Sequence, residues 1–202
     1  MGRRARLMDK ERGFTLIELL TVMMIVGALV LLAVPALRNF WFVRALESGR
    51  QEVQSQLRRQ QQRVVAETHP LVYGLRFPNR DSGQTPLDQV GIVRFNGRDP
   101  STTDDDLCGL ENVVDLPTGV EVGQVRTTMG DPYVTDFCKN QIRDELDLPS
   151  NDHFVFFFAR GNANAAQIEL VQVRLEDRPA YLCVSPVTAR VFEIESPPCA
   201  YT

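Results

Sequence analysis

A long apolar run near the N-terminus is the feature that most limits how this chain can fold. Residues 14–34 are 21 consecutive residues in which Glu18 is the only charged side chain. A helix of that length rises about 30 Å, the thickness of the hydrocarbon core of a bilayer. The run therefore predicts a membrane-spanning helix. Because a carboxylate inside a bilayer costs at least about 2.5–3.5 kcal/mol, Glu18 is expected to have a partner.

The residues before the run predict its orientation. Residues 1–12 hold five basic and two acidic side chains, a balance of +3. Positive residues stay on the cytoplasmic side, so the N-terminus is expected inside and the rest of the chain exported. A cleaved secretory signal peptide is the competing interpretation. It fits less well because the apolar run is long, contains Glu18, and is followed by Pro35 where small residues would be needed for cleavage.

The segment that joins the leader to the apolar run has the sequence GFTLIELL, residues 13–20. It resembles the prepilin motif of type IV pilins and type II secretion pseudopilins. The resemblance implies that a prepilin peptidase cleaves between Gly13 and Phe14 and methylates the new amine of Phe14. It also implies that Glu18 pairs with the Phe14 amine of a neighbouring subunit during assembly. The alternative for Glu18 is that it snorkels to the interface or is protonated.

The same resemblance implies a set of partners and locations. The partners are other pilin or pseudopilin subunits, the prepilin peptidase, an inner-membrane assembly platform, and the lipid bilayer before assembly. The expected location is the inner membrane, followed by a periplasmic or extracellular filament. Gly27 and Pro35 weaken the helix, and the resemblance implies that this stretch melts in the filament. A simple proline kink is the alternative for an isolated subunit.

An amphipathic pattern indicates that the helix continues beyond the membrane to about Ala66. Leu46, Val53, Leu57 and Val64 recur at helical spacing with polar residues between them. We expect this stripe to pack on the chain's own sheet rather than in a coiled coil, because few heptads are available. The expected organisation is a leader at 1–13, a transmembrane and filament-core helix at 14–35, an amphipathic helix at 36–67, and an exported β domain at 70–202.

The exported domain reads as strand-rich, which gives an α+β, type IV pilin-like fold class. Ile168 and Leu170 share one phase of the strand, whereas Val171, Val173 and Leu175 share the other, which predicts either a bulge near Val171 or burial of both faces. The uniformly apolar segment 154–158 is expected to be a central strand under the helix. The C-terminal run of predicted strands, from Phe156 to Val191, loosely resembles the C-terminal region of the GspH/FimT minor pilin class. Strands are predicted at 71–77, 90–95, 120–125, 154–158, 168–175, 181–184 and 187–194, with loops at 78–86 and 96–106.

All four cysteines lie in the expected exported domain. An even number of cysteines on the oxidising side of a membrane favours disulfides, and three pairings are open. Loop length favours pairing neighbours in sequence. The candidates are Cys108 with Cys138 and Cys183 with Cys199.

Metal binding and catalysis have little support in the sequence. No CxxC pair occurs, and the two histidines, His69 and His153, do not complete a zinc site. The acidic run 104–106 suggests calcium, but a solvated loop is the stronger interpretation. Neither a nucleophile elbow nor a phosphate-binding loop is present. We therefore expect no enzyme activity, no cofactor and no metal.

DNA is the less favoured partner. Without the leader the chain holds 17 basic and 24 acidic residues, a net charge of −7, which repels phosphates. Arg174, Arg178 and Arg190 could form a local patch, although exposed strand positions explain them better. The sequence and the resemblance therefore predict a minor pilin or minor pseudopilin, a subunit of a type IV pilus or of a type II secretion pseudopilus. The subunit is expected within the filament or at the filament tip. A filament-associated module for DNA uptake in competence, or for adhesion, is the alternative.

Overall fold

The structure is a computed structural model, and its described residues form one long helix and eight strands. It describes residues 15–67, 71–78, 80, 86–96, 108–128, 152–158, 160–175 and 178–199. The helix α1 spans Leu16–Ala66. The strands are β1 (Leu71–Phe77), β2 (Gln89–Asn96), β3 (Cys108–Asp115), β4 (Val120–Thr128), β5 (His153–Phe157), β6 (Ala165–Gln172), β7 (Ala180–Val184) and β8 (Val191–Ile194).

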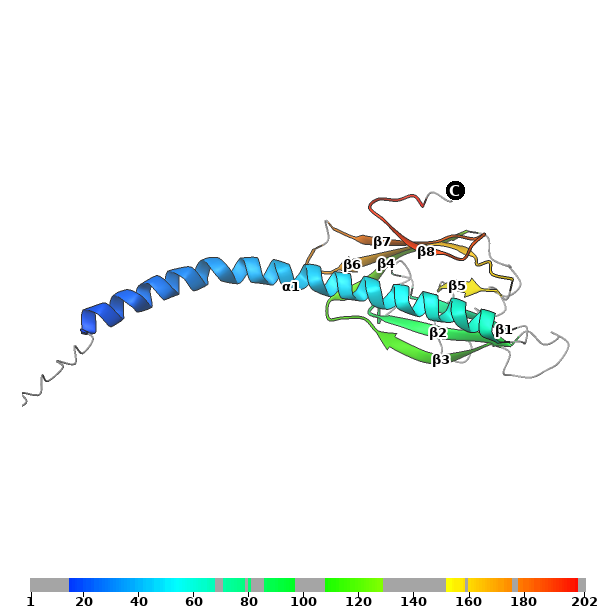
Figure 1. Cartoon of the computed structure of the whole chain (residues 1–202), viewed down its shortest axis with the longest axis horizontal. Coiled ribbons are helices and arrows are strands. Elements are labelled where there is room, and N and C mark those ends of the chain that lie inside the picture. The colour runs from blue at the N-terminus through cyan, green and yellow to red at the C-terminus, as the bar shows by residue number, and fades with distance from the viewer. Residues whose placement is uncertain are drawn as a thin grey trace, which may run out of the picture. The chain divides into compact units, whose positions relative to one another are not determined.

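The strands form two antiparallel sheets of four strands each. The first sheet has the order β3-β2-β1-β5 and the second has the order β4-β6-β7-β8. Figure 1 shows the C-terminal part of α1, in cyan, lying beside both sheets. The chain divides into two compact units, residues 1–40 and 41–202, and α1 contributes to both.

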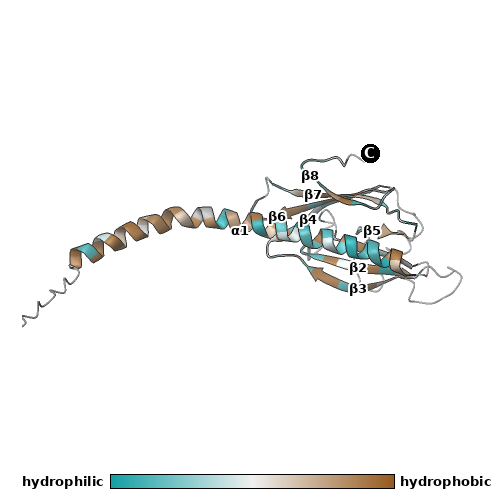
Figure 2. Ribbon diagram, viewed as in Figure 1, coloured by the Kyte–Doolittle hydropathy of each residue, from teal (hydrophilic) through white to brown (hydrophobic). Residues whose placement is uncertain are grey.

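The amphipathic half of α1 packs as its sequence predicts. Leu46, Val53, Leu57 and Val64 are all buried and share one core cluster with residues of both sheets. Leu57 is fully buried, whereas Val65 on the same helix is 68% exposed. The alternation of apolar and polar residues along this part of α1 is visible in Figure 2. The predicted α+β arrangement, a long helix packed on a strand-rich domain, is confirmed.

Most of the predicted strands are confirmed, and one strand was missed. β1, β2, β4 and β7 fall within two or three residues of their predicted bounds. β6 begins three residues earlier than predicted and ends at Gln172, and β8 begins only at Val191 because residues 186–188 form a turn. The sequence analysis did not predict β3. Its exposed positions 111–113 lack an apolar alternation, so a periodicity argument cannot detect it.

The prediction that 154–158 is a central strand was wrong. Within the sheet β5 pairs only with β1 and so lies at its edge, although four of its five residues are buried. Residues 162–164 cover the outer edge of β5 through backbone hydrogen bonds to Phe156 and Phe158. Asn164, which is 2% exposed, adds contacts from its side chain. The Asn164 carboxamide accepts the N–H of Phe156 at 2.6 Å and donates to the carbonyl oxygen of Phe154 at 2.7 Å. The backbone of residues 162–164 and the Asn164 side chain together supply the pairing that a further strand would give.

The ambiguous register of β6 has a clear explanation. Seven of the eight residues of β6 are buried, so both faces of the strand are covered. The irregularity lies in the partner strand, where the β4 register shifts between Val122 and Val125. Of the two alternatives left open, burial of both faces is the one observed in β6. The bulge is on β4, opposite Glu169.

Candidate anchoring and assembly segment

The first turn of α1 has the chemistry of a capped helix start. The Thr15 hydroxyl accepts the N–H of Glu18 at 3.3 Å, and the Thr15 carbonyl accepts the N–H of Leu19 at 3.2 Å. Thr15 therefore acts as the N-cap, and Glu18 lies three residues later, the spacing of a capping box. A carboxylate in the first turn also interacts favourably with the helix dipole. Gly13 and Phe14, the predicted cleavage and methylation positions, lie outside the described residues.

The apolar half of α1 is not covered by the described residues of its own unit. Its most apolar 18-residue window has a mean hydropathy of 2.6, and none of that window is buried. Leu16, Leu31 and Leu32 are each more than 75% exposed. In the described part of the chain, α1 is the helix that has the length and composition to cross a membrane. Such a surface needs lipid or neighbouring apolar helices around it.

The predicted melting positions lie within a continuous helix. α1 runs through Gly27 and Pro35 without interruption. A Cβ added at Gly27 would meet no atom within 4 Å, so nothing in the subunit requires glycine at this position. Melting of this stretch in a filament stays a prediction.

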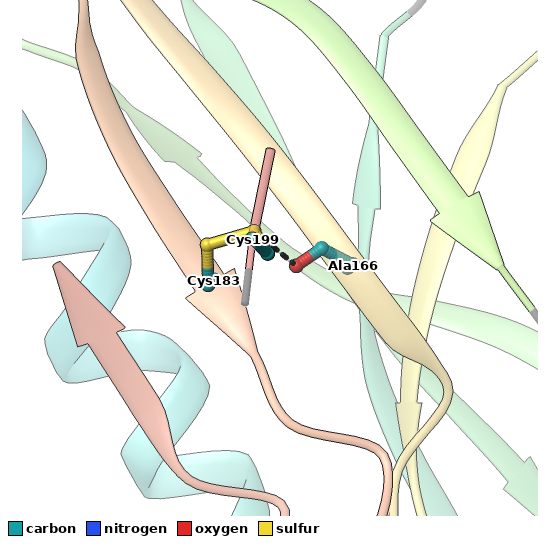
Figure 3. The surroundings of a disulfide bond; sticks show 3 residues. All are labelled: Ala166, Cys183 and Cys199. Atoms are coloured by element: carbon teal, nitrogen blue, oxygen red, sulfur yellow. Dashed lines mark hydrogen bonds between the residues drawn. A yellow bond between two sulfur atoms is a disulfide. The ribbon is translucent and has the colours of Figure 1, made fainter. Parts of the chain in front are cut away.

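One of the two predicted disulfides is present in the described residues. Cys183 of β7 and Cys199 are bonded, with their Cα atoms 5.9 Å apart (Figure 3). The Cys199 sulfur also lies 3.9 Å from the carbonyl oxygen of Ala166 on β6. The bond therefore fixes the C-terminal segment over β6 and β7. Cys138 and the side chain of Cys108 lie outside the described residues, so their pairing stays a prediction.

The three arginines considered for DNA contact occupy loops, not strands. Arg174 and Arg178 lie between β6 and β7, and Arg190 lies between β7 and β8. In consecutive antiparallel hairpins these two loops lie at opposite ends of β7, about 17 Å apart for a strand of five residues. Arg174 also stacks on the ring of Phe42, 5.4 Å from its centroid. The expectation of exposed strand positions was wrong, although all three side chains are exposed.

The metal candidates gain no geometric support. Residues 104–106 and His69 lie outside the described residues, and His153 is part of β5. Among the described residues no three His, Cys, Asp or Glu side chains gather closely enough to hold a metal ion.

Polar contacts between α1 and the sheets were not predicted. Arg50 is 2.7 Å from Glu193 of β8 and 2.6 Å from Glu47 on its own helix. Arg63 is 2.7 Å from Glu111 of β3, and its guanidinium lies 4.5 Å from the centroid of the Tyr73 ring. The pairs of Arg50 with Glu193 and of Arg63 with Glu111 join residues far apart in the chain, so periodicity alone could not indicate them.

Beside these contacts lies a buried tyrosine. The Tyr73 hydroxyl donates to the Glu67 carboxylate at 2.6 Å. Burial of the phenol, together with this hydrogen bond, raises the pKa of Tyr73 to about 12. The alkaline form of Tyr73 is therefore disfavoured in the folded domain.

Comparison with known proteins identifies the class of the N-terminal segment. Residues 8–34 match the family model described as the prokaryotic N-terminal methylation motif. The match covers the predicted cleavage site, Glu18 and the apolar run, and it confirms the motif recognised in the sequence. The matched residues make up a small part of the chain. A search of curated proteins found no match to the chain.

Among solved structures, the chain is similar to the minor pseudopilin EpsH from the type 2 secretion system of Vibrio cholerae. The sequences are 10% identical, and the similarity covers 72% of this chain and 92% of that chain with a TM-score of 0.43. So remote a likeness carries no functional inference by itself.

Proposed function

We propose that the chain is a minor pilin or minor pseudopilin, a structural subunit of a type IV pilus or a type II secretion pseudopilus. It is stored in the inner membrane, cleaved between Gly13 and Phe14 by a prepilin peptidase, and methylated on the Phe14 amine. An assembly platform then transfers it into the filament or to its tip. The exported domain supplies contacts with other subunits.

The observation that carries the proposal is the methylation motif at residues 8–34 on a helix whose apolar surface is uncovered. In the membrane, lipid covers this surface. In a filament, the apolar helices of neighbouring subunits replace the lipid, and the interior of the bundle has a low dielectric constant. In that setting Glu18 is neutralised by the Phe14 amine of a neighbour, since an unpaired buried charge would cost about 3–5 kcal/mol.

The rest of α1 supports the same function. Residues that follow the membrane span anchor the helix to the domain through Leu46, Val53 and Leu57. A pull on the N-terminal half during extraction from the membrane is therefore transmitted to a packed domain. Within the described residues the structure offers no competing use for the exposed apolar half.

Mass spectrometry of the membrane-bound protein tests the proposal. We expect a mature chain that begins with methylated Phe14. Gly13→Val places a branched side chain at the scissile bond and is expected to leave the precursor uncut, whereas Gly2→Val, elsewhere in the leader, is the matched control and is processed normally. An unmodified N-terminus, or a cleavage site elsewhere, would contradict the proposal.

A further inference from the structure

A polar cavity of about 390 Å³ lies on the second sheet, away from the core that contacts α1. Its floor is made of outward-facing residues of β4, β6 and β7, because Val122, Ile168 and Leu182 on the same strands point into the core. Arg80, which follows β1, and Pro197, from the C-terminal segment, complete the lining. Ligand cavities in proteins are commonly about 300–1,000 Å³, so this one is large enough for a few side chains.

The floor is shaped by the bulge in β4. The N–H of Gln124 leaves the strand ladder and donates to the Glu169 carboxylate at 3.0 Å. Gly123 makes this possible, since a Cβ there would lie 2.9 Å from the Cγ atoms of both Glu169 and Val171. Tyr181 lies near Glu169, and burial together with this neighbouring carboxylate raises the pKa of Tyr181. Among the described residues of the lining, Glu169 is the one carboxylate, and it already accepts the Gln124 N–H.

The wall is held by the disulfide. Cys199, two residues after Pro197, is bonded to the fully buried Cys183 of β7 (Figure 3). The C-terminal segment is thereby fixed across β6 and β7. Pro197 cannot leave the cavity without moving this bridge, so the site is preorganised rather than formed by a free tail.

The free hydrogen-bonding capacity of the cavity is mainly that of donors. In the described part of the chain the Arg80 guanidinium has neither an ion pair nor a hydrogen bond. Arg126 contacts the Gln124 side chain at 3.3 Å and forms no ion pair with a described residue. Gln167 is only 9% exposed and lines the cavity. Its carboxamide can both donate and accept hydrogen bonds.

We propose that this cavity binds a glutamate or aspartate side chain of an acidic peptide segment from another protein of the filament. The inference rests on the proposed function as a filament subunit. The guanidinium groups of Arg80 and Arg126 receive the carboxylate, because their planar donor arrays match its two oxygens. The carboxamides of Gln124 and Gln167 offer a donor and an acceptor each to the adjoining peptide groups. Val171 and Pro197 supply the apolar contact that limits access of water.

The same features disfavour polyanions. The chain without its leader carries a net charge of −7, which repels nucleic acid, and one small cavity with two guanidinium groups does not track a phosphate backbone. A single carboxylate needs only the local field of the two arginines. The chemistry therefore selects an acidic side chain presented by a peptide.

Calorimetric titration of the full-length chain in non-ionic detergent micelles tests the inference. The probe is the peptide acetyl-Gly-Glu-Glu-Gly-amide, and the matched probe is acetyl-Gly-Gln-Gln-Gly-amide. We expect saturable binding of the glutamate peptide and at least about tenfold weaker binding of the glutamine peptide, as for loss of one charge-assisted contact. Arg80→Ala and Arg126→Ala should each weaken the glutamate peptide about fivefold or more. Both arginines are exposed, so these variants are expected to fold.

Arg160→Ala is the matched control, because this exposed arginine lies in the turn after β5 and does not line the cavity. It should bind the peptide like the unchanged chain. Equal affinity for the glutamate and glutamine peptides, or an equal loss with Arg160→Ala, would overturn the inference. Displacement of the peptide by equimolar inorganic phosphate would also overturn it, in favour of a phosphate-bearing ligand. A chain that is correctly processed at Gly13 but fails to bind the peptide refutes this inference and leaves the proposed function intact.

Discussion

The Asn164 carboxamide oxygen accepts the backbone N–H of Phe156 at 2.6 Å, at the edge of the first sheet. The same side chain donates to the Phe154 carbonyl oxygen. Both strand residues are buried, so water cannot replace these bonds. Together with the backbone hydrogen bonds of residues 162–164, this side chain covers an edge that would otherwise leave buried backbone groups unpaired.

Asn164→Ala should destabilise the domain by about 1–3 kcal/mol, because it leaves a buried donor and a buried acceptor without partners. The free energy of unfolding from urea titration measures this loss. Amide hydrogen exchange should be accelerated at Phe156 before it is accelerated in β1. Asn112→Ala on exposed β3 is the control and should change stability by less than about 0.5 kcal/mol. Equal effects of the two substitutions would contradict the role of Asn164.

Leu57→Ala should cost about 2–5 kcal/mol, since Leu57 is fully buried between α1 and the sheets and its removal leaves a cavity. Val65→Ala on the same helix is the matched control. Val65 is 68% exposed, so its truncation should alter the free energy of unfolding by less than about 0.5 kcal/mol. If Leu57→Ala were as mild as Val65→Ala, the packing of α1 on the domain would be wrong.

Removal of the disulfide should destabilise the domain by about 3 kcal/mol, because Cys183 and Cys199 are 16 residues apart and their bond restricts the unfolded chain. The double variant Cys183→Ala with Cys199→Ala tests this by thermal unfolding. A reducing agent should act slowly on the unchanged chain, since Cys183 is fully buried. An unchanged melting temperature in the double variant would show that the bridge is not structural.

Tyr73 should make stability fall at high pH. Below about pH 10 the phenol is protonated in both the folded and the unfolded chain, so its full contribution is present. Between about pH 10 and about 12 the unfolded chain loses the proton while the folded chain keeps it, and the contribution is progressively lost. The ultraviolet absorbance of tyrosinate should show a late titration component that Tyr73→Phe removes. A Tyr73→Phe chain with the same late component would assign it to another tyrosine.

Glu18→Gln should leave cleavage intact and abolish incorporation into the filament, because glutamine keeps the size of the side chain and lacks the charge that pairs with the Phe14 amine. The measurement compares the mature protein in membranes with the protein in sheared filament fractions. Glu195→Gln, at an exposed position after β8, is the control and should assemble normally. Normal assembly of the Glu18→Gln chain into filaments would contradict the proposed pairing of Glu18 with the Phe14 amine.

The helix could be predicted closely because its signals are local. Apolar length predicts the span, and the spacing of Leu46, Val53 and Leu57 predicts the buried face. These depend only on the 3.6-residue period of the helix. β1 and β7 could be predicted for a similar reason, since their apolar residues are confined to short runs between turn formers.

β3, the edge position of β5 and the polar cavity could not be predicted in this way. β3 is exposed and carries no apolar alternation. The uniformly apolar β5 looks central, and the contacts that residues 162–164 make with it show how an edge strand can be so buried. Arg80 and Arg126 are 46 positions apart, and no sequence signal connects them. The isolated Gly123 in a strand was the one local sign of a bulge.

The sequence is enough to predict the N-terminal motif, the membrane-spanning length of the helix and the buried stripe of its second half, because each depends on neighbours along the chain. The three-dimensional arrangement was needed to show which strands share a sheet, how the edge of β5 is covered, and which side chains surround the cavity. These depend on residues brought together from distant positions, where packing and hydrogen bonding, rather than local periodicity, select the arrangement.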